Sequence, residues 1–181
     1  MNVSKTELPG VLIINPVVHR DDRGFFLETY HQDRYIQHGM DTGFVQDNYS
    51  ASRQNTLRGL HVQPHNPQCK LVRVVEGEIF DVIVDIRRQS ATFCRWVGLH
   101  LSSDNYRQCY IPSGYAHGFC VLSRQAHVEY KCSTFYSPND EISIAWNDPT
   151  IGIKWPINVP VLSPRDRDAP SIKEIFDNLP D

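Results

Sequence analysis

The chain has 181 residues and a formal net charge of −3, and this length suffices for one domain with a hydrophobic core. Its pI of about 6.2 predicts no broad basic surface, which argues against nucleic acid as a partner. No apolar run is long enough to span a bilayer, and the first residues lack the apolar core of a signal peptide, so we expect a cytoplasmic protein that makes no membrane contact.

Strand patterns dominate the chain from residue 11 to residue 133. Short runs rich in β-branched and aromatic residues, several of which alternate with polar residues, lie at 11–14, 25–30, 70–75, 79–86, 92–101, 107–111, 118–122 and 128–133. Glu76-Gly77-Glu78, between two of these runs, predicts a tight hairpin. Pro112-Ser113-Gly114 predicts a turn.

Helical patterns are weak and peripheral. Residues 33–38 and 171–178 predict short helices, the second with Ser171 as its cap. No internal repeat or linker divides the chain, so we expect one all-β domain over residues 1–181 with short peripheral helices. Periodicity alone does not choose between a jelly roll, an immunoglobulin-like sandwich and a lipocalin barrel. The five cysteines contain no C-x-x-C spacing and predict free thiols.

His61 is a candidate general base. It ends the motif Arg58-Gly59-Leu60-His61, in a run that reads as a strand. Strict alternation places Arg58 and His61 on opposite faces of that strand, unless a bulge at Gly59 shifts the phase. A histidine whose hydrogen bonds are satisfied at a strand end is the structural alternative.

Three further side chains have the chemistry of a proton-transfer site. Tyr130 is either a core or surface tyrosine, or a phenol whose hydroxyl finds its partner in a substrate. Lys70 is either a sheet-edge lysine or a cation that stabilises a developing negative oxygen. Asp166 lies in a polar segment, 163–170, and is either solvated there or orients the His61 imidazole. If the strands of His61 and Tyr130 face each other across a barrel, the four groups form a site that needs neither metal nor cofactor.

A metal site is the main chemical alternative. His61 and His65 form H-x-x-x-H, with His117 as a distant third candidate ligand, whereas metal-binding cupin barrels use H-x-H followed by Glu. Because that motif is absent, the pattern does not favour a metal. G-x-S-x-G, G-x-G-x-x-G and P-loop motifs are also absent, so serine-nucleophile, nicotinamide and ATP chemistry find no support.

Several runs, in order along most of the chain, resemble one family. They are 22–28 (DRGFFLE), 44–48 (FVQDN), 57–61 (LRGLH), 70–73 (KLVR), 80–87 (FDVIVDIR), 107–108 (RQ), 111–119 (IPSGYAHGF), 130–132 (YKC) and 146–149 (WNDP). In these runs the chain is similar to the dTDP-4-dehydrorhamnose 3,5-epimerases. The resemblance implies a cupin-type jelly-roll barrel, no cofactor, and a homodimer whose N-terminal strands cross to the second subunit.

The resemblance also implies a substrate and a set of roles. The substrate is dTDP-4-dehydro-6-deoxy-D-glucose, epimerised at C3 and C5 to dTDP-4-dehydro-L-rhamnose through an enolate. His61 is then the base, Tyr130 the acid, Lys70 the partner of the enolate oxygen, and Asp166 the residue that orients His61. The implied substrate-binding residues are Arg23, Phe26, Glu28, Gln46, Asn48, Arg58, His117, Lys131, Tyr136, Glu141 and Arg165.

Three alternatives remain beside this expectation. Departures from the family pattern at Val62, Cys69, Glu129 and Arg165 leave room for an epimerase acting at one carbon, or for a ketoisomerase of the same fold. A metal-dependent cupin oxygenase and a non-catalytic sugar-nucleotide binding module are the other two.

Overall fold

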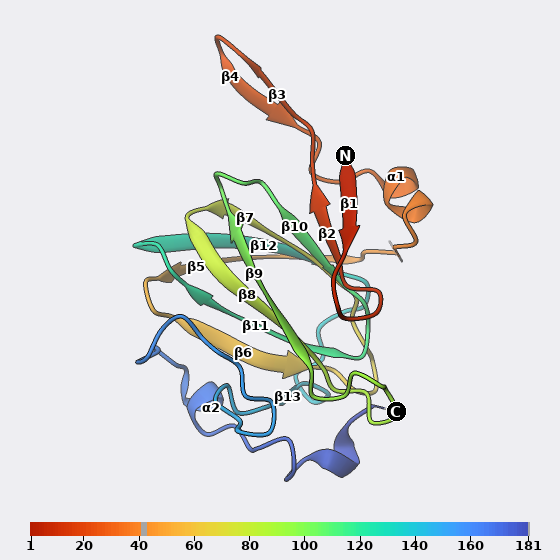
Figure 1. Cartoon of the computed structure of the whole chain (residues 1–181), viewed down its shortest axis with the longest axis vertical. Helices are drawn as coiled ribbons and strands as arrows, with labels where there is room; N and C mark the ends of the chain where they lie inside the picture. Colours follow the sequence, from red (N-terminus) through yellow and green to blue (C-terminus); the bar gives the residue numbers. More distant parts are fainter. Residues whose placement is uncertain (41–42, 181) are drawn as a thin grey trace.

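Two sheets stacked face to face make up the body of the molecule (Figure 1). The computed structural model describes residues 1–40 and 43–180. Over these ranges one sheet has six strands, the other has five, and a separate hairpin has two. The prediction of an all-β chain with short helices is confirmed.

The six-stranded sheet consists, in spatial order, of β1 (Asn2–Lys5), β2 (Leu12–Asn15), β10 (Gln108–Ile111), β7 (Lys70–Glu76), β12 (Gln125–Cys132) and β5 (Gln46–Arg53). The five-stranded sheet consists of β13 (Ile142–Ser143), β6 (Leu57–Val62), β11 (Tyr115–Val121), β8 (Glu78–Asp85) and β9 (Trp96–Ser102). From β5 to β8, and again from β10 to β13, each strand joins the sheet opposite to that of the strand before it. Neighbouring strands in both sheets pair antiparallel, and this connectivity is that of a jelly roll.

The main core lies between the sheets. Val72 and Val128 of the six-stranded sheet and Ile83 and Val121 of the five-stranded sheet are fully buried there. On the other face of β8, Val82 and Val84 pack beneath residues of the C-terminal segment. Because β8 is covered on both faces, its sequence is an apolar run rather than an alternating pattern.

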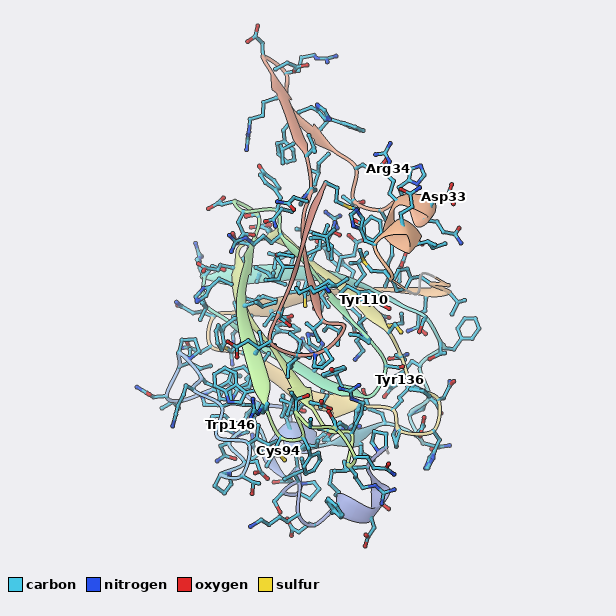
Figure 2. The ribbon with its side chains drawn as sticks, turned by 45° about the vertical axis from the view of Figure 1, so that its right-hand side comes forward. Asp33, Arg34, Cys94, Tyr110, Tyr136 and Trp146 are labelled. Atoms are coloured by element: carbon cyan, nitrogen blue, oxygen red, sulfur yellow. The ribbon has the colours of Figure 1, made fainter. Side chains whose placement is uncertain are left out.

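In the part of the chain that the structure describes, the periphery consists of one hairpin and three short helices. The hairpin of β3 (Val18–Asp21) and β4 (Gly24–Leu27) stands away from the body of the molecule (Figure 1). The helix α1 (Gln32–Gln37) follows, with Asp33 and Arg34 on its outer side (Figure 2). Near the C-terminus, α2 (Pro164–Arg167) and the 3₁₀ helix η1 (Phe176–Asn178) lie on the side of the five-stranded sheet.

The predicted hairpin at residues 76–78 is wrong. Its two strands, β7 and β8, belong to different sheets, so Gly77 carries the chain across the sandwich. Gly77 has a φ of +81°, and a Cβ there would lie 2.1 Å from the Gln125 carbonyl oxygen, which explains the glycine. Gly114 has a φ of +86° within the predicted turn after Pro112, which is confirmed.

The helix predictions are correct in part. Residues 33–38 correspond to α1, whereas residues 172–175 form turns and only Phe176–Asn178 is helical. Ser171 does not cap a helix in the expected way, since its hydroxyl donates to the Glu174 carboxylate at 2.6 Å. The segment around Asp166, expected as a polar loop, contains α2. The five cysteines are free thiols, as expected, and over the described ranges no helix is long and apolar enough to cross a membrane.

Candidate active site

A cavity of about 400 Å³ opens between the two sheets, and all four candidate acid–base residues line it. Lys70 on β7 and Tyr130 on β12 belong to the six-stranded sheet, whereas His61 is on β6 of the five-stranded sheet. Asp166 comes from α2. The imidazole and the phenol therefore reach one cavity from opposite sheets.

A bulge at Gly59 brings Arg58 and His61 to the same cavity. In the pairing of β6 with β11, His61 faces His117 and Arg58 faces Phe119, so two residues of β6 oppose one residue of β11. Gly59 has a φ of +123°, and a Cβ on it would lie 2.6 Å from the Gly118 Cα. The sequence predicts that Arg58 and His61 share a face of the strand only if a bulge occurs at Gly59. The bulge is present, and both side chains line the cavity.

His61 and Asp166 form a hydrogen-bonded pair across 105 residues of sequence. The His61 Nε2 lies 2.6 Å from the Asp166 Oδ1. Asp166 is 4% exposed, and the Ser163 hydroxyl donates to its Oδ2 at 2.8 Å. Burial works to raise the pKa of Asp166, but hydrogen bonds from His61, Ser163 and the Gly59 backbone outweigh burial and hold that pKa below its usual value.

An ionised carboxylate only accepts hydrogen bonds, so the His61 Nε2 must carry the proton in this pair. In the neutral imidazole this leaves the Nδ1 lone pair free to accept a proton. The geometry of this pair therefore requires the tautomer of His61 with the proton on Nε2.

Lys70 and Tyr130 lie beside each other on the opposite wall. The Lys70 Nζ is 6.0 Å from the centroid of the Tyr130 ring. Burial lowers the pKa of Lys70, against the opposing effect of Cys132, Glu141 and Asp81. Burial raises the pKa of Tyr130, so the phenol keeps its proton at neutral pH.

A second imidazole–carboxylate pair lies next to His61. His117 on β11 lines the cavity, and its Nε2 is 2.7 Å from the Oδ1 of Asp81, a fully buried residue of β8. His65, by contrast, is exposed, and its backbone N–H donates to Asp140 at 3.1 Å. Residues 1–40 and 43–180 contain no group of three or more His, Cys, Asp and Glu side chains placed to hold a metal ion.

Six further predicted binding residues also line the cavity: Gln46, Asn48, Arg58, Tyr136, Glu141 and Arg165. The Tyr136 hydroxyl donates to the Glu141 carboxylate at 3.1 Å, and Arg165 forms a short ion pair with the same carboxylate. Arg165 also donates to Ser143 at 2.9 Å. Tyr136 lies on the right-hand side of the molecule in Figure 2, and its side chain is only half-buried, so the ring can receive a ligand.

Four predicted binding residues do not line this cavity. Lys131 follows Tyr130 and therefore points to the opposite face of β12, where its ammonium pairs with Asp47 at 3.0 Å. Arg23 and Phe26 are on the exposed β3–β4 hairpin, where Phe26 is 69% exposed. Glu28 pairs with Arg34 of α1 at 2.8 Å.

The sequence reasoning missed several residues that line the cavity: Ser50, Gln68, Gly118, Phe119 and Ser163. Two of them had a readable signal. Ser50 follows Asn48 by two residues, so strand alternation places both on one face. Ser163 precedes Pro164 and stands three residues before Asp166, a pattern typical of a helix N-cap, and its hydroxyl accepts from the Asp166 N–H at 3.1 Å.

Comparison with known proteins agrees with this architecture. The sequence model of the family described as dTDP-4-dehydrorhamnose 3,5-epimerase matches residues 5–174. The chain belongs to the dTDP-4-dehydrorhamnose 3,5-epimerase family. It is 51% identical over 177 residues to the dTDP-4-dehydrorhamnose 3,5-epimerase of Salmonella typhimurium, covering 96% of this chain and 97% of the relative. These matches confirm the expected family and the expectation that the chain is an isomerase.

Solved structures show the same fold. A dTDP-6-deoxy-D-glucose-3,5-epimerase from Legionella pneumophila, in complex with dTDP-4-keto-L-rhamnose, superposes with a TM-score of 0.96 at 47% identity, covering 99% of this chain and 97% of that one. ChmJ, a 3'-monoepimerase from Streptomyces bikiniensis in complex with dTDP-quinovose, gives a TM-score of 0.91 at 33% identity, covering 97% and 91%. The cupin-type jelly roll is thereby confirmed, and the comparisons support dTDP-4-dehydrorhamnose 3,5-epimerase activity for this family member.

Proposed function

We propose that the chain converts dTDP-4-dehydro-6-deoxy-D-glucose to dTDP-4-dehydro-L-rhamnose by proton transfer at C3 and C5, without a cofactor. The observation that carries the proposal is the placement of His61 and Tyr130 on opposite walls of one cavity. Inversion of a carbon needs a base on one face of the sugar ring and an acid on the other. Residues 1–181 act as one epimerase domain in this proposal.

His61 removes the proton. The ketone at C4 acidifies the C–H bonds at C3 and C5, because the resulting carbanion is delocalised as an enolate. The free Nδ1 of His61 accepts the proton, and the imidazolium that forms is stabilised by the Asp166 carboxylate 2.6 Å from Nε2. A base of this kind contributes about 10²–10⁴-fold to the rate.

Lys70 stabilises the enolate. Its ammonium lies at the cavity wall beside Tyr130, where a negative oxygen at C4 gains a charge-assisted hydrogen bond that the neutral ketone lacks. An interaction that strengthens as charge develops lowers the barrier rather than only the binding energy.

Tyr130 returns a proton from the opposite face. Burial raises its pKa, with further contributions from Cys132 and Glu141, so the phenol is present in its acid form across the neutral range. Replacement of the proton on the face opposite to His61 is the step that inverts each carbon.

The nucleotide holds the sugar between these groups. Arg58 suits the diphosphate, because its guanidinium offers parallel hydrogen-bond donors. Its Nε donates to the Ser52 hydroxyl at 3.0 Å, and this bond holds the side chain in place. Tyr136 at the cavity mouth offers a ring for the thymine to stack on. Gln46, Asn48, His117, Glu141 and Arg165 complete the proposed contacts. Binding energy from this remote group orients the reacting carbons.

A second subunit completes the proposed site. The β3–β4 hairpin carries two phenylalanines, Phe25 and Phe26, that are 54% and 69% exposed although Phe25 contacts the Tyr106 ring. A hairpin of two strands is marginal on its own, so we propose that it crosses to a partner and supplies Arg23, Phe26 and Glu28 to that partner's cavity. Molecular mass in solution tests this: a homodimer is expected, and an active monomer would contradict it.

Incubation with dTDP-4-dehydro-6-deoxy-D-glucose in heavy water, followed by proton NMR, tests the proposed reaction. We expect deuterium at both C3 and C5 and formation of the rhamnose-configured product. The alternative is an epimerase acting at one carbon, and a protein described as a 3'-monoepimerase, ChmJ, shares the fold at 33% identity. Exchange confined to one carbon would establish that alternative and exclude the 3,5-epimerase.

A further inference from the structure

Two loops that form the mouth of the cavity are tied to each other. They are residues 63–69, after β6, and residues 133–141, after β12. The Cys69 N–H donates to the Ser133 hydroxyl at 2.8 Å, and the Asn66 N–H donates to the Asp140 carboxylate at 2.7 Å. The position of the second loop, which carries Tyr136, therefore depends on the first.

One buried amide, that of Gln63, contacts the backbone on both sides of Tyr136. The Gln63 Nε2 donates to the carbonyl of Phe135 at 3.4 Å, and the Ser137 N–H donates to the Gln63 Oε1 at 2.8 Å. The same Nε2 donates to the Asn66 carbonyl at 2.9 Å. Gln63 is 4% exposed, so its amide is shielded from water. Losing it removes the acceptor of the Ser137 N–H, whereas the Phe135 carbonyl keeps a bond from the Asn66 Nδ2 at 3.4 Å.

Gln63 does not line the cavity, and so it has no access to a bound substrate. Tyr136 itself is held in addition by its N–H, which donates to Gln46 at 2.8 Å, and by its hydroxyl on Glu141. The Gln63 amide hydrogen-bonds both neighbours of Tyr136, and it follows directly after β6, the strand that carries His61.

We infer that Gln63 is a positioning residue for nucleobase recognition. It holds the Tyr136 ring in place before a nucleotide with a flat pyrimidine base arrives. A ring that is already fixed loses less conformational entropy when the nucleotide binds. The hydrogen bonds of Gln63 therefore lower the Kd for the nucleotide. This inference rests on the proposed function, because it assigns Tyr136 to the base of a dTDP-sugar.

Gln63→Met tests the role, since methionine keeps the length of the side chain and removes its hydrogen bonds. We expect the Kd for dTDP, measured by calorimetry, to rise about tenfold. KM for the dTDP-sugar rises in parallel, whereas kcat and its pH profile stay within about twofold, because the acid–base groups are untouched. A fall in kcat at unchanged KM would overturn the inference.

Gln54→Met is the control for losing an amide–carbonyl hydrogen bond at an exposed position away from the cavity. The Gln54 Nε2 also donates to a backbone carbonyl, that of Leu122 at 2.8 Å, but Gln54 does not line the cavity and lies outside both mouth loops. The control variant should bind dTDP as the natural chain does. An equal loss of affinity in Gln54→Met and Gln63→Met would overturn the inference, since the effect would then be one of general stability.

A double-mutant cycle with Tyr136→Ala separates positioning from other effects. If Gln63 acts through Tyr136, Gln63→Met weakens dTDP binding in the natural background and adds no more than about twofold in the Tyr136→Ala background. Two losses that multiply would overturn the inference. If Gln63→Met fails to fold, Gln63→Glu takes its place, because glutamate keeps the acceptor for the Ser137 N–H and loses the donor to the Phe135 carbonyl. If Gln63→Glu then binds dTDP as tightly as the natural chain does, the inference is overturned.

The dTDP measurements also separate this inference from the proposed reaction. A natural chain that binds dTDP but never exchanges protons of the 4-keto sugar contradicts the reaction and leaves the role of Gln63 in place. A natural chain that turns over normally, with Gln63→Met equal to it in dTDP affinity, contradicts the role of Gln63 alone.

Discussion

Asp166→Asn probes the pair that is proposed to set the His61 tautomer. Three donors converge on the Asp166 carboxylate: the His61 Nε2 at 2.6 Å, the Ser163 hydroxyl at 2.8 Å and the Gly59 backbone N–H. Asparagine has nearly the same shape but replaces one acceptor oxygen by an NH₂ group. One of the three donors must then lose its partner, or the His61 ring must change tautomer.

The magnitude follows from these two outcomes. If the amide oxygen faces His61, the imidazolium loses a charge-assisted bond and keeps a neutral one, a difference of about 1–2 kcal/mol, or about 5- to 30-fold in rate. If the NH₂ group faces His61, Nε2 becomes the acceptor and Nδ1 is protonated, which removes the base and lowers kcat by up to about 10⁴-fold. We therefore expect a loss of at least about fivefold in kcat, with dTDP affinity retained.

Initial rates of deuterium incorporation at saturating substrate measure kcat for the first proton transfer, and calorimetry measures dTDP binding. Asp104→Asn, the same substitution at an exposed loop position, is the control and should behave as the natural chain. An Asp166→Asn variant with kcat within twofold of the natural chain would refute the reasoning, because the carboxylate would then contribute nothing to the base.

The rate constant kcat/KM should fall at alkaline pH with a midpoint below pH 10.5, because burial lowers the pKa of Lys70, whereas burial raises the pKa of Tyr130. Lys70→Arg should shift this alkaline midpoint to higher pH, and an unchanged midpoint would exclude Lys70 as its origin. Asp85→Asn should lower the free energy of unfolding by about 2–3 kcal/mol at pH 7. It should not change kcat, because the fully buried Asp85 accepts from Arg87 at 2.6 Å and neither residue lines the cavity. Burial opposes ionisation of Asp85, but hydrogen bonds hold its folded pKa below the unfolded value of 3.8. The difference in unfolding free energy between the natural chain and Asp85→Asn should therefore be complete above pH 4 and should shrink as the pH falls below 3.8. Urea unfolding at several pH values checks this dependence.

Much of the fold was readable from the sequence because most strands bury one or both faces. The apolar runs that became β7, β8, β10, β11 and β12 were all predicted from that pattern. The strand β5 was missed, since its inward positions are polar: Gln46, Asn48 and Ser50 line the cavity rather than the core. A strand whose inner face binds a polar ligand lacks the apolar period that predicts strands.

The site was harder to read than the fold. Asp166 reaches His61 because α2 lies beside β6, a long-range contact that no local pattern contains. The residues alone left open whether Asp166 is solvated or orients His61, and the family resemblance chose the second. The bulge at Gly59 changes which residues share a face, so alternation alone would have separated Arg58 from His61. Strand alternation does hold at Tyr130 and Lys131, whose side chains point to opposite faces of β12. The family resemblance had implied that Lys131 contacts the substrate, but in this chain Lys131 does not line the cavity.

The most direct test of the central claim compares His61→Asn with Tyr130→Phe in heavy water. If the imidazole is the base and the phenol the acid on the opposite face, His61→Asn abolishes deuterium incorporation at C3 and C5 while still binding dTDP. Tyr130→Phe then retains exchange at the first carbon but loses net inversion. Deuterium uptake at the natural rate in His61→Asn, or complete inversion in Tyr130→Phe, would contradict the account.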